Sequence, residues 1–258
     1  MKKLLFTLCL IAGYSQTASA ADITLLSTLN TTQFKTLSED FGAALSYKPV
    51  SPTAPLGGMI GFGVDIGVEA TSTDISKSAA VLDKATGTTT GLSTLVVPKL
   101  HVAVGLPFGI DIAAFTTYIP SSNIQVTGEE IRVAIIKGGV AAPAISVRGA
   151  ITQMTGVTDW SFDTKSLDLS ISKGFAMFTP YAGVGQVWVN SMVNSTKIDG
   201  STIQSKVFAG ANLNFGLTNV AMEYDTTGGI TSYSFKLGFR FFRDIRNRSG
   251  WRGKCNAC

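Results

Sequence analysis

Two arginines and two carboxylates in the middle of the chain have the types and spacing of a charged binding site. Glu130 and Arg132 are two residues apart, so an extended strand places both side chains on one face. Pairing across the short turn that follows puts Arg132 about opposite Arg148, and the next loop brings Asp168 beside Arg148. Such a cluster binds an anionic solute or forms a selective constriction. An alternative interpretation is that the four charges neutralise one another inside a narrow lumen.

A second group of charges comes from distant parts of the sequence: Asp65, Lys99 and Lys236. If the first and last strands pair to close a sheet, Asp65 meets Lys99 on one side and Lys236 on the other. We interpret this group first as an ion pair at the closure and second as a solute site. Its net stabilisation depends on how far the charges are removed from water.

Residues suited to catalysis or metal binding are few. His101 is the sole histidine, but the sequence places no serine or carboxylate beside it, which favours an ordinary lumen histidine over an acid–base catalyst. Cys255 and Cys258 form one C-x-x-C pair, which is half a zinc site and ends the chain, so a short disulfide or an unstructured end is the simpler interpretation. The sequence therefore predicts no catalytic residue, no metal site, no cofactor and no enzymatic activity.

These side chains are positioned by strands, because apolar residues alternate with small or polar ones from Gly57 onward. The last segment, 233–242, has five large apolar side chains on one face and serine, lysine, glycine and arginine on the other. In 176–190 the pattern does not decide which face is apolar. The expected strands lie at about 57–69, 92–106, 110–120, 129–137, 144–154, 165–172, 176–190, 203–215, 219–226 and 233–242.

A strand with one apolar face, one polar face and an aromatic C-terminal end suits a barrel with lipid outside and water inside. In this segment the chain resembles the β-barrel proteins of the Gram-negative bacterial outer membrane. The resemblance implies an all-β, transmembrane, antiparallel up-and-down barrel of about ten strands over 57–242, in the bacterial cell outer membrane. Short and longer connections also alternate, as expected for periplasmic turns and external loops. A soluble β-sandwich explains only the alternation within strands.

Aromatic residues give a second indication, because interfacial girdles form at both ends of membrane strands. The residues expected at the periplasmic rim are Phe108, Phe175, Phe178, Phe215, Phe239 and Phe241. Those expected at the outer rim are Tyr118, Trp160, Phe162, Trp188, Tyr224 and Tyr233.

The region before the strands follows other patterns. Residues 1–20 have a positive start, an apolar stretch and an Ala-Ser-Ala end, which is typical of a secretory signal peptide. In 21–56, apolar residues recur every three or four positions, and Asn30 with Gln33 resembles a capping box. Together they predict an amphipathic helix over about 31–45, followed by a proline-rich connector. We expect this helix either to plug the lumen or to lie at the periplasmic mouth. Residues 243–258 form a basic C-terminal tail.

The composition narrows the class of function. Without residues 1–20 the chain carries 19 basic and 17 acidic side chains, and this near-neutral balance argues against nucleic acid as a partner. Beyond the signal peptide no stretch of about 18 apolar residues exists, which excludes a spanning helix. A content of 45% hydrophobic and 15% charged residues requires either a large soluble core or a lipid-facing surface, and the strand pattern favours the lipid-facing surface.

The leading hypothesis for function is a narrow channel or transporter for small solutes with a helix plug. Its expected partners are outer-membrane lipids, a small solute and the barrel-assembly machinery. A structural or adhesive surface protein that presents external loops is the first alternative. An outer-membrane enzyme ranks lower, because no catalytic group of residues is evident.

Overall fold

The computed structural model describes residues 22–57, 61–120, 122–139 and 141–244. The expected signal peptide at 1–20 lies outside the described residues, as does most of the basic tail with Cys255 and Cys258. Within the described part of the chain, no helix is long and apolar enough to cross a membrane.

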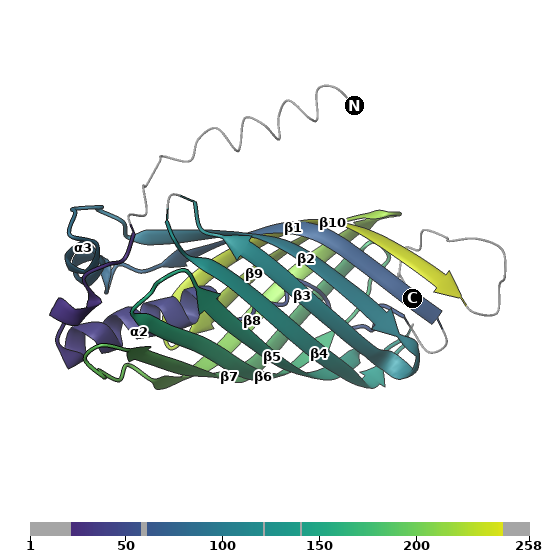
Figure 1. Cartoon of the computed structure of the whole chain (residues 1–258). Coiled ribbons are helices and arrows are strands. Elements are labelled where there is room, and N and C mark those ends of the chain that lie inside the picture. The colour runs from purple at the N-terminus through teal and green to yellow at the C-terminus, as the bar shows by residue number, and fades with distance from the viewer. Residues whose placement is uncertain (1–21, 58–60, 121, 140, 245–258) are drawn as a thin grey trace, which may run out of the picture.

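In the described residues, ten strands form one closed antiparallel barrel, in which consecutive strands pair and β1 pairs with β10 (Figure 1). The strands are β1 (Gly61–Asp74), β2 (Thr94–Leu106), β3 (Ile110–Tyr118), β4 (Gln125–Lys137), β5 (Ala144–Thr155), β6 (Trp160–Ser172), β7 (Phe178–Val193), β8 (Thr202–Phe215), β9 (Thr218–Thr227) and β10 (Ile230–Asp244). The prediction of an all-β up-and-down barrel is confirmed. Closure leaves no sheet edge unpaired, as the hydrocarbon region of a membrane requires.

The two ends of the barrel differ in their connections. Those after β2, β4, β6 and β8 are short and lie at the end where β1 begins and β10 finishes (Figure 1). The β2–β3 connection there is a 3-10 turn, η2 (Pro107–Gly109). The opposite end carries the long β1–β2 connection, which contains helix α3 (Ala79–Thr86), an element that the sequence pattern did not predict. Because outer-membrane barrels have short periplasmic turns, we call these the periplasmic end and the outer end.

The strands turn apolar side chains outward and polar ones inward, with the phase expected from the sequence. On β1, Ile66 and Val68 are 43% and 57% exposed on the outer wall, whereas Asp65 and Glu69 are 1% and 4% exposed and point inward. An apolar wall around a charged interior is the reverse of a soluble barrel and suits a lipid surrounding.

Strand β7 takes the phase that the sequence left open. Tyr181, Val187 and Val189 are buried inward, and Val184 faces outward. The inward valines lie where the plugging helix crosses the lumen, since a Cβ added at Gly42 of that helix would overlap the Val189 side chain. The phase of β7 is therefore set by contact with a helix that is remote in the sequence.

Strands β4 and β6 start well before the residues at which the alternation begins. Strand β4 begins at Gln125 rather than near 129, and β6 begins at Trp160 rather than near 165. Their outward residues there include Thr127 and Asp163, which are polar. The strands thus extend beyond the apolar band, and apolar alternation alone does not detect that extension.

Several expected girdle residues lie on the outer wall. At the periplasmic end Phe108 is 77% exposed, and at the outer end the rings of Tyr224 and Tyr233 are 5.4 Å apart on the exposed face. The assignment of Trp160 and Phe162 to the outer girdle is wrong, because each is 3% exposed and points into the lumen. Both serve instead as apolar partners for the plugging helix.

Helix α2 (Thr31–Leu45) lies inside the barrel at its outer end, so it plugs the lumen and does not cover the periplasmic mouth (Figure 1). The helix starts at the expected capping box. Gln33 N donates to Asn30 Oδ1 at 2.8 Å, and Asn30 N donates to Gln33 Oε1 at 3.1 Å. These two bonds satisfy backbone donors that the first helical turn leaves free.

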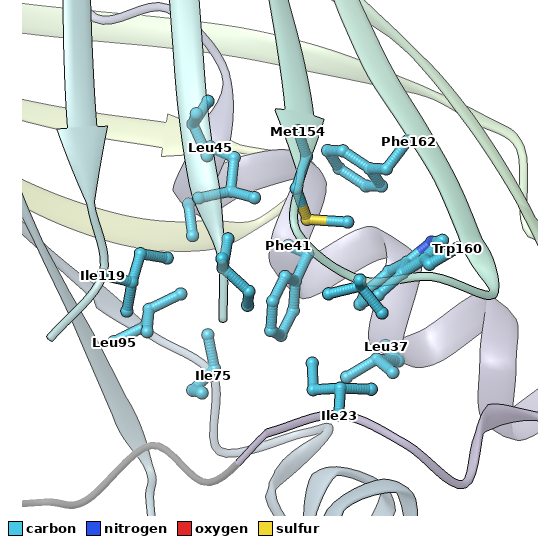
Figure 2. Packing of buried hydrophobic residues seen from close by; sticks show 14 of the residues in the cluster. Ile23, Leu37, Phe41, Leu45, Ile75, Leu95, Ile119, Met154, Trp160 and Phe162 are labelled. Atoms are coloured by element: carbon cyan, nitrogen blue, oxygen red, sulfur yellow. The ribbon is translucent and has the colours of Figure 1, made fainter. Parts of the chain in front are cut away.

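An apolar cluster surrounds α2 in the outer half of the lumen (Figure 2). The Phe41 ring lies 5.1 Å from the Trp160 ring, which is 5.5 Å from that of Phe162. Other members come from the helix, the strands and the outer connections: Ile23, Leu37, Leu45, Ile75, Leu95, Ile119 and Met154. Burial of the helix stripe against the barrel wall is the main force that holds the helix in place.

Candidate functional site: the plugged lumen

The lumen contains the N-terminal segment 22–57, which we call the plug. It consists of a short 3-10 helix, η1 (Leu26–Thr28), helix α2 and a connector over 46–57. Along the plug, contacts move from the outer ends of the strands to their periplasmic ends. Ser38 Oγ lies 2.7 Å from Ser191 Oγ near the outer end of β7, whereas Leu56 N donates to Asp111 Oδ1 at 3.0 Å near the periplasmic start of β3. The plug therefore runs along the length of the lumen.

Polar contacts fix the outer part of the plug in addition to the apolar cluster. Ser78 N donates to Asp40 Oδ2 at 2.9 Å, which ties α2 to the residue before α3. Gln204 Nε2 donates to the backbone oxygen of Glu39 at 3.0 Å. Helix, outer connection and strand wall are thus joined at this end.

The middle of the lumen holds Tyr47 and Lys48, both almost fully buried. Lys48 Nζ lies 2.6 Å from Asp225 Oδ1 on β9 and also donates to Ala43 O at 2.8 Å. Lys206 Nζ on β8 donates to the Tyr47 backbone oxygen at 2.7 Å. Here an ion pair and a charge-assisted hydrogen bond join the plug to the wall.

The connector continues toward the periplasmic end through backbone contacts. Val50 N donates to Glu223 Oε2 at 3.1 Å, and Arg132 Nη1 donates to Pro52 O at 2.8 Å. Thr53 N donates to Ser172 Oγ at 3.1 Å. Prolines in this stretch prevent a helix and remove amide donors that would otherwise need partners inside the lumen.

The predicted neighbours of Arg148 are confirmed. Arg132 lies opposite Arg148 in the β4–β5 register, and Asp168 lies opposite Arg148 in the β5–β6 register. Arg148 forms an ion pair with Asp168, lies 3.6 Å from Glu130, and has its guanidinium 5.4 Å from the Phe208 ring centre. The four residues of the first cluster therefore meet in the lumen.

Sequence reasoning missed the main partner of Arg132, which is Asp111 on β3 at 2.7 Å. It also missed Lys206, whose Nζ lies 3.6 Å from Asp168 Oδ2. Both residues lie at inward positions of their strands, and this alternation was the signal that could have identified them as lumen charges. What the sequence lacks is the stagger between strands, which sets the depth of each charge in the lumen.

The second cluster is confirmed only in part. Lys236 Nζ lies 2.8 Å from Asp65 Oδ1, but the other partner of Asp65 is Arg240, at 2.7 Å. The expected Asp65–Lys99 pair is wrong, because the β1–β2 register places Lys99 opposite Glu69, four residues further along β1. Strand stagger is again the reason.

His101 lies among lumen side chains and contacts the plug. Its Nε2 is 3.1 Å from Tyr47 Oη, and its Nδ1 is 3.4 Å from Glu69 Oε1 and 3.3 Å from Lys236 Nζ. In the described residues, no group of three or more His, Cys, Asp or Glu side chains is arranged to hold a metal ion. The contacts of His101 are those of a residue that positions the plug.

Charge is concentrated on the inner face of the strands. Among the described strand residues, seven carboxylates point inward and are buried: Asp65, Glu69, Asp111, Glu130, Asp168, Glu223 and Asp225. Six cations do the same: Lys99, Arg132, Arg148, Lys206, Lys236 and Arg240. Lys48 of the plug supplies a seventh. A closed barrel with an apolar exterior and this charged interior is built for lipid surroundings.

The chain has the fold of a membrane-spanning β-barrel. No protein-family model matches it, and no curated protein matches it. Among solved structures, this barrel is similar to an outer membrane channel from Pseudomonas putida F1, at 11% identity and a TM-score of 0.46, over 77% of this chain and 99% of that one.

Two further barrels show the range of the likeness. The KdgM porin is 7% identical with a TM-score of 0.36, over 68% of this chain and 98% of that one. Ail, the attachment invasion locus protein of Yersinia pestis, is 12% identical with a TM-score of 0.29, over 71% and 100%. At these identities and TM-scores, the likeness assigns no role to this barrel.

Proposed function

We propose that the protein is a gated channel or transporter for small solutes, in which the N-terminal plug leaves the lumen before solute passes. Absence of enzymatic activity is part of the same proposal. The observation that carries this proposal is that the plug fills the lumen without being hydrogen-bonded into the β-ladder. The barrel closes through β1 and β10, and the plug contributes no strand to it.

A displaced plug therefore breaks no hydrogen bond of the barrel ladder. The plug joins the barrel covalently only where residue 57 leads toward β1. Its other contacts are side-chain hydrogen bonds, ion pairs, apolar packing and a few backbone hydrogen bonds at its two ends, none of which belongs to the ladder. The wall also keeps ion pairs of its own, such as Arg148–Asp168 and Arg240–Asp65, when the plug is absent. The emptied lumen would be polar enough to hold water and solute.

Deletion of the whole plug tests the proposal. Removing residues 21–56 is expected to produce steady ion conductance in planar bilayers, whereas the full-length protein stays closed or opens rarely. Folding of the variant is checked first by heat-modifiable migration and circular dichroism. A correctly folded deletion barrel that does not conduct would refute the channel proposal.

A shorter deletion is the matched control. Removing only 21–48 takes away α2 but leaves the lower connector, whose contacts with Glu223, Arg132 and Asp111 hold it in the periplasmic half of the lumen. We expect this variant to conduct much less than the longer deletion. Equal conductance would show that the helix alone forms the gate.

The arginine pair should set ion preference once the plug is gone. Without Lys48, the described inward charges leave one more carboxylate than cations, so the open barrel should favour cations weakly. Replacing Arg132 and Arg148 with glutamine in the 21–56 deletion leaves Glu130 and Asp168 dominant there. The expected result is a reversal potential shifted further toward cation selectivity under a salt gradient. Unchanged selectivity in a folded variant would make the cluster structural only.

A surface-binding role is the second candidate. The observation that favours it is the ordered outer end, where the plug, α3 and the strand ends pack together (Figure 1). A full-length barrel that never conducts but binds a host or cell-surface molecule would support this role over transport.

A further inference from the structure

The two ends of the described chain lie at opposite ends of the barrel. Thr24 N and Leu25 N donate to Ala85 O of α3, at 3.2 and 2.8 Å, so the start of the plug is at the outer end. Strand β10 finishes at the periplasmic end, where Asp244 pairs with Gly61. With ten strands alone, both ends would lie on one side. The plug adds one further crossing.

We propose that the barrel carries its own N-terminal segment through the lumen and presents it at the cell surface. The helix alone does not span the membrane, because 15 helical residues measure about 22 Å and the hydrocarbon core is about 30 Å thick. The connector completes the crossing, and Gly57 O accepts from Gly61 N at 3.0 Å where β1 begins. The sequence predicts export by a signal peptide, so the segment reaches the outer side from the periplasm.

The lumen wall is suited to polypeptide in general. Over Tyr47 to Leu56, five wall residues contact backbone groups of the connector, in addition to the side-chain contacts of Tyr47, Lys48, Ser51 and Thr53. Lys206 and Arg132 donate to carbonyl oxygens, and Glu223, Ser172 and Asp111 accept from amides. Backbone groups recur in every peptide, so these contacts do not depend on the sequence that passes. This path of the N-terminal segment through the lumen does not depend on whether small solutes also pass.

Cysteine labelling on intact cells tests the proposal. In a background with Cys255→Ser and Cys258→Ser, the variants Asp22→Cys and Thr31→Cys place a thiol at exposed positions at the start of the plug. A membrane-impermeant maleimide is expected to label both on intact cells. Two variants are used so that one with a folding defect does not end the test.

Two positions calibrate the labelling. Thr88→Cys lies in the outer β1–β2 connection and should be labelled on intact cells. Leu217→Cys lies in the exposed β8–β9 turn at the periplasmic end and should be labelled only after the outer membrane is permeabilised. If the two plug variants behave like Leu217→Cys while Thr88→Cys is labelled, the proposal is wrong. Labelling of the plug variants together with Thr88→Cys supports it.

Discussion

Replacing Arg148 with alanine is expected to destabilise the folded barrel by about 3–5 kcal/mol, because it leaves buried Glu130 and Asp168 without the cation that lies between them, and Asp168 keeps only the longer contact with Lys206. Arg148 is 2% exposed, forms an ion pair with Asp168 and lies 3.6 Å from Glu130. It also packs against Phe208, so the truncation removes aromatic contact as well. The measurement is the free energy of unfolding in urea, followed by intrinsic tryptophan fluorescence in liposomes.

A double variant and a surface control separate ion pairing from general damage. The double variant Arg148→Ala, Asp168→Asn should lose less stability than the sum of the two single variants. Each single change leaves the other member of the ion pair buried without its partner. Lys165→Ala, on the outer face of β6, should stay within about 0.5 kcal/mol of the parent. If Arg148→Ala also stays within 1 kcal/mol, water screens the cluster and the lumen is wetter than its burial indicates.

Much of the fold could be predicted because strand alternation is a local signal. Each inward charge is flanked directly in the sequence by outward residues that are mostly apolar, so the phase of β1, β4 or β10 can be read without knowing any partner. The capping box of α2 is local in the same way, and Asn30 with Gln33 marked the helix start. The prediction for Trp160 was wrong because its inward position depends on a helix more than a hundred residues earlier in the chain.

The candidate site was harder to predict, because depth in the lumen depends on strand stagger. Arg132 and Arg148 were placed correctly, since a short turn fixes their register. Asp65 and Lys99 were not, since the long β1–β2 connection with its own helix leaves the stagger free. The backbone contacts of the connector could not be predicted at all, because they depend on the path of an irregular segment.

Glycines on the inner face show that the lumen is packed and not merely polar. A Cβ added at Gly63 would overlap the Leu56 backbone of the connector, and one added at Gly210 would overlap the Tyr181 ring. Large substitutions at these inward sites are therefore not mild. A test of membrane placement needs its controls on the outer wall instead.

Arginine at Ile66 is expected to destabilise the barrel in a bilayer by about 2–4 kcal/mol, as a charge near the bilayer midplane does. Ile66 faces outward near the middle of the apolar band and is 43% exposed, with Val102 and Phe239 opposite it on the neighbouring strands. No carboxylate is among these two neighbours, so the new cation must stay in lipid or distort the wall. The measurement is the free energy of folding into liposomes.

Gln153→Arg is the matched control for this change. Gln153 also faces outward, but it lies on the outer part of β5, with Thr127 and Asp163 opposite it. Arginine there meets polar neighbours and headgroups, so the expected cost is about 0–1 kcal/mol. Measured in detergent micelles, whose apolar layer adapts more easily, the difference between the two variants should shrink. Equal costs for Ile66→Arg and Gln153→Arg in liposomes would contradict the placement of the apolar band in the bilayer.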